Sequence, residues 1–160
     1  MPLLTITVNR REYKVEVEAT TSLLTVLRDH LHITSPKAGC ENGDCGACSV
    51  LVDKLLRRAC LTNALSAQGA EVTTVEGLGA PGDLHPIQKQ FYENFASQCG
   101  YCTPGMIMAT KALLDQNPKP TDEEIKEALS GNLCRCTGYV NIIKAVRAAA
   151  QQMAHWGGYR

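Results

Sequence analysis

The stretch Gln98-Cys99-Gly100-Tyr101-Cys102-Thr103-Pro104-Gly105, read with Gly131-Asn132-Leu133-Cys134-Arg135-Cys136-Thr137-Gly138-Tyr139, organises the C-terminal half of the chain. Each stretch holds a close pair of cysteines and precedes a segment with helical periodicity. A second set lies in the N-terminal half, at Cys40, Cys45, Cys48 and Cys60. All eight cysteines therefore fall into two groups of four, which indicates two separate sites.

The composition is that of an ordinary globular protein, with 44% hydrophobic residues in a chain of 160. Sixteen Lys and Arg balance sixteen Asp and Glu, so no nucleic acid partner is indicated. Apolar runs are too short for membrane insertion, and the N-terminus lacks the layout of a signal peptide. These features predict a cytoplasmic protein. Because thiols stay reduced there, the cysteines are expected to bind metal rather than form disulfides.

Residues 1–76 are expected to form a small α+β sheet domain. Alternating apolar residues predict a β-hairpin around a turn at residues 9–11, and Thr21 or Ser22 can cap a helix that carries Leu23 and Leu27. Further strands are expected at 49–52, around 59–61 and at 71–75.

Residues 77–85, rich in glycine, are interpreted as a linker, after which the apolar period changes from two to about 3.6. Residues 86–160 are expected to form a helical domain, with Ile87, Phe91 and Phe95 on one face of the first helix. Pro104 suits the first turn of the second helix, and a capping box at 121–124 opens the third. A four-helix bundle is the expected architecture. The tail 155–160 shows no period.

The first cysteine set has the spacing Cys40-x4-Cys45-x2-Cys48, which is typical of a plant-type 2Fe–2S cluster with a fourth cysteine further on. Cys60 is the remaining candidate nearby. The glycine-rich backbone of this segment can turn amide N–H groups towards sulfur atoms. A zinc site is the alternative, but zinc knuckles rarely need so long a glycine-rich loop.

The second set, Cys99-x2-Cys102 with Cys134-x-Cys136, matches no general spacing rule, so zinc and iron–sulfur both stay open on spacing alone. Cys102 and Cys136 are each expected just before a helix. Two positive helix ends would then converge on the site and stabilise its negative charge.

Residues 40–48 with Cys60, residues 98–106 and residues 131–139 closely resemble the small iron–sulfur subunit of molybdenum hydroxylases, the xanthine oxidase family. The resemblance covers nearly the whole chain, and its two C-terminal motifs are long and specific. It implies an N-terminal ferredoxin-like β-grasp domain followed by a C-terminal four-helix bundle, each with one 2Fe–2S cluster. The implied ligands are Cys40, Cys45, Cys48 and Cys60 for cluster 1, and Cys99, Cys102, Cys134 and Cys136 for cluster 2.

By the same resemblance, cluster 2 lies near a molybdopterin in a large partner subunit, with Gln98 and Cys136 beside the pterin. Cluster 1 faces the exit route, usually FAD in a medium subunit. The resemblance also implies a hetero-oligomer, with a dimer of heterotrimers as one arrangement. The chain would relay single electrons and carry no catalytic residues, because no nucleophile–base pair or phosphate loop occurs in it. A free-standing two-cluster ferredoxin and a zinc-stabilised interaction module are the rival hypotheses.

Overall fold

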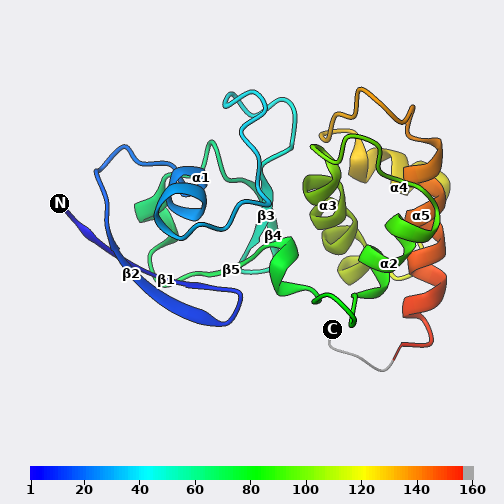
Figure 1. Cartoon of the computed structure of the whole chain (residues 1–160), viewed down its shortest axis with the longest axis horizontal. Helices are drawn as coiled ribbons and strands as arrows, with labels where there is room; N and C mark the ends of the chain where they lie inside the picture. Colours follow the sequence, from blue (N-terminus) through cyan, green and yellow to red (C-terminus); the bar gives the residue numbers. More distant parts are fainter. Residues whose placement is uncertain (157–160) are drawn as a thin grey trace.

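Five strands form one mixed sheet in the N-terminal half of the computed structural model, which describes residues 1–156 (Figure 1). Its order is β2-β1-β5-β3-β4; β1 and β5 run parallel, and the other neighbouring pairs are antiparallel. The strands are β1 Leu3–Val8, β2 Arg11–Glu16, β3 Ser49–Val52, β4 Leu55–Arg58 and β5 Glu71–Thr73. The expected sheet and its N-terminal hairpin are confirmed.

Two-residue turns join β1 to β2 and β3 to β4. Asn9 and Arg10 have φ of 50° and 69°, and Asp53 and Lys54 have φ of 49° and 67°. Left-handed backbone at both central positions matches the right-handed twist of the flanking strands. The strand expected around 59–61 is wrongly placed. The strand after the second turn is β4, which begins at Leu55, directly after that turn, and ends at Arg58.

A short helix covers one face of the sheet. α1 spans Leu23–Thr25 and continues as a π-helical turn over Val26–His30. Ser22 provides the cap, because its Oγ accepts the Thr25 N–H at 3.1 Å. Leu23 and Leu27 are fully buried against the inward side chains of β1. Each such leucine contributes roughly 2 kcal/mol through burial of apolar surface.

Four α-helices follow: α2 Pro86–Glu93, α3 Thr103–Gln116, α4 Asp122–Leu129 and α5 Val140–Met153. The expected capping box of α4 is confirmed, since Thr121 and Glu124 each bond the other's backbone N–H. Phe91 lies in the helical core, but Phe95 follows the end of α2 with φ of 52° and is 78% exposed, contrary to expectation. Residues 157–160 of the tail lie outside the described residues.

His85 caps α2 at the end of the glycine-rich segment. Its Nδ1 accepts the Ile87 N–H at 3.2 Å, and Gln88 bonds back to the His85 N–H at 2.9 Å. The ring is 4% exposed and meets the ring of Trp156 edge to face, with centroids 4.8 Å apart. Burial, and then the charge of Lys111, lower the pKa of His85 to about 4. The two ends of the helical half are thus packed together.

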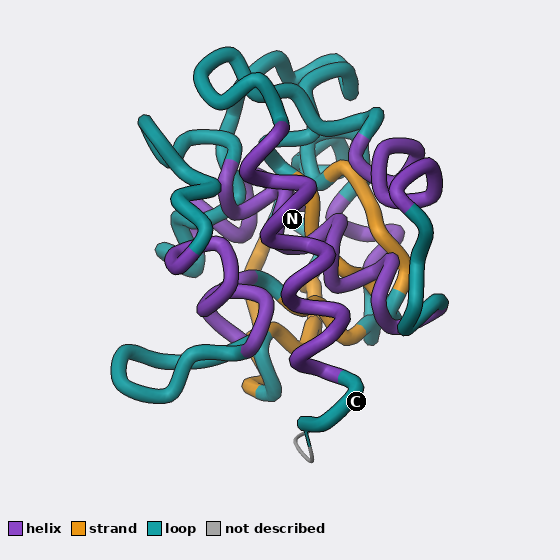
Figure 2. Tube along the Cα trace, turned by 90° about the vertical axis from the view of Figure 1, so that its right-hand side faces the viewer, coloured by secondary structure: helices purple, strands orange, loops and turns teal. Residues whose placement is uncertain are grey.

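The sheet and the helices are joined through α3. Leu51 of β3 packs against Met108 and Ala112 of α3, and all three are buried. β3 therefore has apolar neighbours on both faces, which accounts for the apolar run Val50-Leu51-Val52. Figure 2 shows the strands lying behind the helices in the view from the helical side. None of the helices in the described part is long and apolar enough to cross a membrane.

Candidate metal centres

Cys40, Cys45 and Cys48 of the first set lie on a loop that leads into β3 and contains no helix or strand, whereas Cys60 follows the end of β4. Glu41, Gly43 and Gly46 adopt positive φ, so the chain coils tightly. A side chain at Gly43 would overlap Leu61, which covers the loop. The Cys45 N–H points at Cys40 Sγ at 3.3 Å. The expectation of amide groups turned towards sulfur is therefore confirmed at this position.

The four thiols of this set lie in two contacting pairs, Cys40 with Cys45 and Cys48 with Cys60. Backbone N–H groups of Cys45 and Asn42 lower the pKa of Cys40 to about 7. Burial, followed by the neighbouring Cys48, raises the pKa of Cys60 to about 11. Cys48 is 2% exposed, so the second pair is the more enclosed.

The second set is paired in the same way. Cys99 and Cys136 are exposed, with their sulfur atoms 3.5 Å apart, and Cys102 contacts Cys134. Burial raises the pKa of Cys102 to about 12. Burial also opposes ionisation of Cys134, but hydrogen bonds from Thr137 outweigh it and lower the pKa of that thiol.

Only one helix begins directly at this set. α3 starts at the residue after Cys102, as expected. α5 starts at Val140, after Tyr139 in a left-handed conformation with φ of 68°, so Cys136 is not adjacent to a helix end. A single helix N-terminus therefore faces these sulfur atoms, not the two that the sequence predicted.

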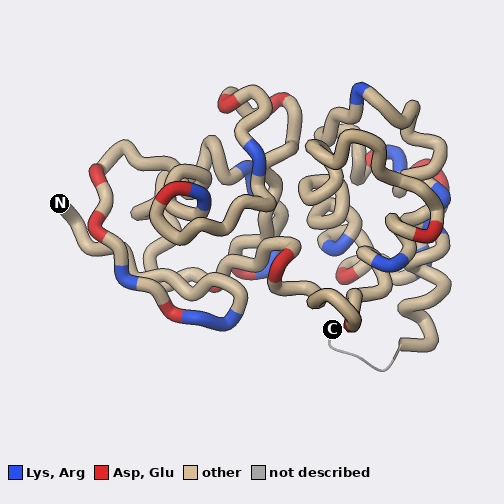
Figure 3. The backbone as a smooth tube through the Cα atoms, in the orientation of Figure 1, with Lys and Arg blue, Asp and Glu red and all other residues tan. Residues whose placement is uncertain are grey.

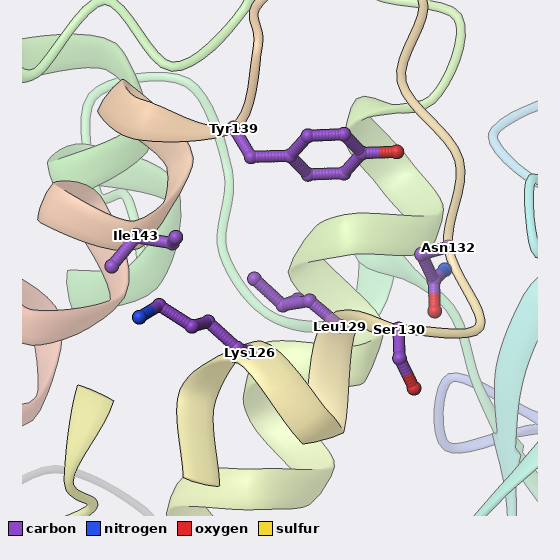
Figure 4. A pocket seen from close by; sticks show the side chains of 6 residues that line it. All are labelled: Lys126, Leu129, Ser130, Asn132, Tyr139 and Ile143. Atoms are coloured by element: carbon purple, nitrogen blue, oxygen red, sulfur yellow. The ribbon is translucent and has the colours of Figure 1, made fainter. Parts of the chain in front are cut away.

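Tyr139 supports the loop that carries Cys134 and Cys136. Its hydroxyl accepts the Cys134 N–H at 2.9 Å. Its ring lines a small cavity of about 180 Å³ between α4 and α5, together with Leu129 and Ile143 (Figure 4). The ring thus joins the cysteine loop to the helical core.

The loops that carry most of the two cysteine sets lie along the same edge of the molecule, the upper one in Figure 1. A cavity of about 430 Å³ there is lined by Cys45 of the first loop and by all four cysteines of the second set. Hydrogen bonds cross between the loops: the Leu133 N–H donates to the Cys45 carbonyl at 2.9 Å, and the Tyr101 hydroxyl donates to the Ala38 carbonyl at 2.7 Å. Gln98, expected at a pterin, is exposed next to Cys99.

Beneath this cavity the two halves approach closely at glycines. A Cβ at Gly105 of α3 would overlap the Gly46 carbonyl oxygen, and one at Gly131 would overlap the Arg58 guanidinium. Asn132 is 2% exposed, and its Nδ2 donates to the Gly46 carbonyl at 3.0 Å. No local sequence pattern identifies these residues, because their partners are far away in the chain.

The residues present fit 2Fe–2S clusters. Such a cluster takes four thiolates, two on each iron, and each set supplies two contacting pairs.

Two known families match the chain. The 2Fe–2S iron–sulfur cluster binding domain covers residues 6–71, and the 2Fe–2S binding domain covers residues 74–147. The aldehyde oxidoreductase iron–sulfur-binding subunit PaoA of Escherichia coli K12 is 44% identical over 96% of the chain and 73% of that protein. A nicotinate dehydrogenase subunit from Pseudomonas putida is 47% identical over 90% of the chain and 92% of that protein.

The chain is a small iron–sulfur subunit of the xanthine oxidase family.

Solved structures agree. Quinoline 2-oxidoreductase from Pseudomonas putida 86 has a chain that matches with a TM-score of 0.92 and 40% identity, over 96% of each chain. The aldehyde oxidoreductase of Desulfovibrio desulfuricans matches with a TM-score of 0.94 and 42% identity. That match covers 97% of this small iron–sulfur subunit but only 17% of the longer aldehyde oxidoreductase chain.

Proposed function

We propose that this chain is the electron-transfer subunit of a molybdenum hydroxylase, which relays single electrons between a molybdopterin centre on a large partner and a flavin or other acceptor. A bound 2Fe–2S cluster supplies one-electron chemistry without taking up or releasing substrate atoms. Cys40, Cys45, Cys48 and Cys60 hold cluster 1, and Cys99, Cys102, Cys134 and Cys136 hold cluster 2. The contacting pairs within each set support this assignment.

The observation that carries the proposal is the link between the two sets. Leu133 is covalently bonded to Cys134, and its N–H donates directly to the carbonyl of Cys45. One hydrogen bond therefore joins a ligand residue of one set to the neighbour of a ligand residue in the other. The chain holds its two redox sites in a fixed relation, as a relay requires and a pair of independent metal sites does not.

The exposed end of the second set supports a large partner. Cys99 and Cys136 are open to solvent in the isolated chain, and five large exposed apolar residues lie near them in sequence: Tyr92, Phe95, Tyr101, Leu133 and Val140. The Asn141 side chain donates to the Phe95 carbonyl at 3.4 Å and so joins the start of α5 to the end of α2. Gln98 and Cys136 on this face would contact the partner's molybdopterin.

The first set would serve the acceptor, on a medium FAD-binding subunit in a hetero-oligomer such as a dimer of heterotrimers. A cytoplasmic location is supported by the eight free thiols. Figure 3 shows acidic and basic residues interspersed over both halves, and sixteen Lys and Arg balance sixteen Asp and Glu, which does not favour nucleic acid as a partner. The presence of one main apolar core in each half supports a β-grasp domain over 1–76, a linker over 77–85 and a four-helix bundle over 86–160.

The names of the relatives do not favour the rival hypotheses. The names describe parts of enzymes, not free ferredoxins or zinc proteins. This holds for PaoA, for the nicotinate dehydrogenase subunit of Pseudomonas putida and for the nicotine 6-hydroxylase small subunit of Paenarthrobacter nicotinovorans. The protein from the nicotine enzyme is 47% identical over 94% of the chain.

Metal analysis and electron paramagnetic resonance test the proposal. The chain, expressed with its partners and reduced with dithionite, should contain the iron and acid-labile sulfide of two 2Fe–2S clusters and give two distinct rhombic signals. Purification through a tag on this chain should also recover molybdenum in stoichiometric amount with a large subunit. Zinc in place of iron, or recovery of the chain alone, would contradict the proposed function.

A further inference from the structure

Arg58 lies between the two cysteine sets. It stands at the end of β4, two residues before Cys60, and its side chain leaves the sheet towards the helical half. Nη2 donates to the Gly131 carbonyl at 2.7 Å, just before the loop of Cys134 and Cys136. Nη1 donates to the Ser49 Oγ at 3.0 Å, next to Cys48. One guanidinium therefore contacts the segments that carry both sets.

Within residues 1–156, this guanidinium has no carboxylate within ion-pair distance. Its contacts are a carbonyl and a hydroxyl, and the hydroxyl of Ser49 is itself buried. The Nε–H of Arg58 is buried without a partner, as is Oδ1 of the neighbouring Asn132. A partly buried cation without a countercharge is costly, so a negative charge is expected close by in the functional state.

The proposed clusters supply that charge. Four thiolates around a two-iron, two-sulfide core leave an oxidised 2Fe–2S cluster with a net negative charge. Reduction adds one electron to the cluster and forms or breaks no bond, so the cluster becomes more negative by one unit. A fixed cation nearby stabilises the reduced form more than the oxidised form.

We propose that Arg58 is a positioning and charge-compensating residue that raises the reduction potentials of both clusters. This inference rests on the proposed function, because the clusters provide the negative charge. Its geometry is specific: the planar fork of the guanidinium bonds to one carbonyl on the side of cluster 2 and one hydroxyl on the side of cluster 1. Arg58 thus acts electrostatically on the two sites and touches neither substrate nor pterin.

The test is a redox titration of the holoenzyme, followed by electron paramagnetic resonance. In Arg58→Gln, the reduction equilibrium of both clusters should shift towards the oxidised form by at least about threefold, because one partly buried unit charge is lost. In Arg58→Lys, the reduction potentials of both clusters should stay close to those of wild type, since lysine keeps the positive charge. Arg57→Gln is the matched control: Arg57 is exposed on the opposite face of the same strand, so its loss should shift neither equilibrium measurably.

Ionic strength distinguishes the loss of a partly buried charge from the loss of a surface charge. The shift in Arg58→Gln should persist at high ionic strength, because partly buried charges are screened less than exposed ones. Should Arg58→Gln fail to retain its iron, Asn132→Asp tests the same site with the guanidinium in place, and its added negative charge should lower both potentials.

Equal potentials in wild type, Arg58→Gln and Arg57→Gln would overturn the inference and leave the relay intact. In the fallback, unchanged potentials in Asn132→Asp would overturn it too. Absence of 2Fe–2S signals from the wild-type holoenzyme would instead overturn the proposed function itself.

Discussion

Gly105→Ala tests the close approach of the two halves, because two physical effects of opposite sign meet at this position. Gly105 is the third residue of α3 and has ordinary helical backbone. Helix propensity alone predicts that alanine stabilises the protein by about 1 kcal/mol. The added Cβ, however, would overlap the Gly46 carbonyl oxygen and lie 3.2 Å from Asn132 Nδ2.

The overlap should win. The obstacle is backbone from the other half, so α3 must shift at a cost of about 1 to 3 kcal/mol. The shift also strains the hydrogen bond from Asn132 to Gly46, which is worth about 1 kcal/mol. After the gain in helix propensity, a net loss of about 1 to 3 kcal/mol remains. For a chain of this size, that lowers the melting temperature by about 3 to 9 °C.

The assay is thermal unfolding of the cluster-loaded protein, followed by far-ultraviolet circular dichroism under argon. Gly69→Ala is the control: unlike Gly105, Gly69 has a left-handed conformation that disfavours alanine, with φ of 75°, but it has open space around it. The Gly69→Ala variant should be less stable than wild type but keep the magnetic coupling between the clusters. Gly105→Ala should lose stability and alter that coupling as well. A melting temperature of Gly105→Ala equal to or above that of wild type would refute the close approach.

Three further outcomes are expected. Thr137→Val removes the hydroxyl that lies 3.1 Å from Cys134 Sγ, so the potential of cluster 2 should fall while that of cluster 1 stays, and Thr137→Ser should keep both potentials in a redox titration. Cys45→Ser and Cys136→Ser should each halve the iron per chain and remove a different resonance signal; loss of the same signal in both variants would contradict the two-site assignment. His85 has a pKa of about 4 when folded and about 6.5 when unfolded, so the unfolded chain binds more protons between these values. Stability should therefore be lost as pH falls through this window, by up to about 3 kcal/mol, and His85→Asn should flatten the pH dependence of the melting temperature.

Features encoded by neighbouring residues were predictable from sequence. The capping box of α4, the first turn of α3 with Pro104 and the N-terminal hairpin each depend on residues a few positions apart. The misplaced strand shows the limit. Asp53 and Lys54 turn the chain with positive φ at both positions. The pair Asp-Lys does not predict this turn, whereas Asn-Gly or Asp-Gly would.

The cysteines of the candidate site were predictable from the sequence, but the residues that surround them were not. Their grouping follows from spacing, but nothing local indicates that Arg58 reaches Gly131, since these residues are 73 positions apart. Phe95 was misassigned for a related reason. It continues the apolar period of α2, yet Asn94 ends that helix and Phe95 lies outside it, exposed. Periodicity states which residues could share a face, not where the helix stops.

The unequal burial of the cysteines bears on how the metal is delivered. Cys48 is enclosed by the sheet core, whereas Cys99 and Cys136 open onto the surface. A carrier protein can hand a preassembled cluster to the surface pair on an already folded chain, but it cannot reach Cys48 until the sheet opens. On the proposed ligand assignment, the set with Cys48 would receive its cluster during folding, and the set with Cys99 and Cys136 would receive its cluster afterwards. Maturation then has an order, set by which sulfur atoms the fold encloses.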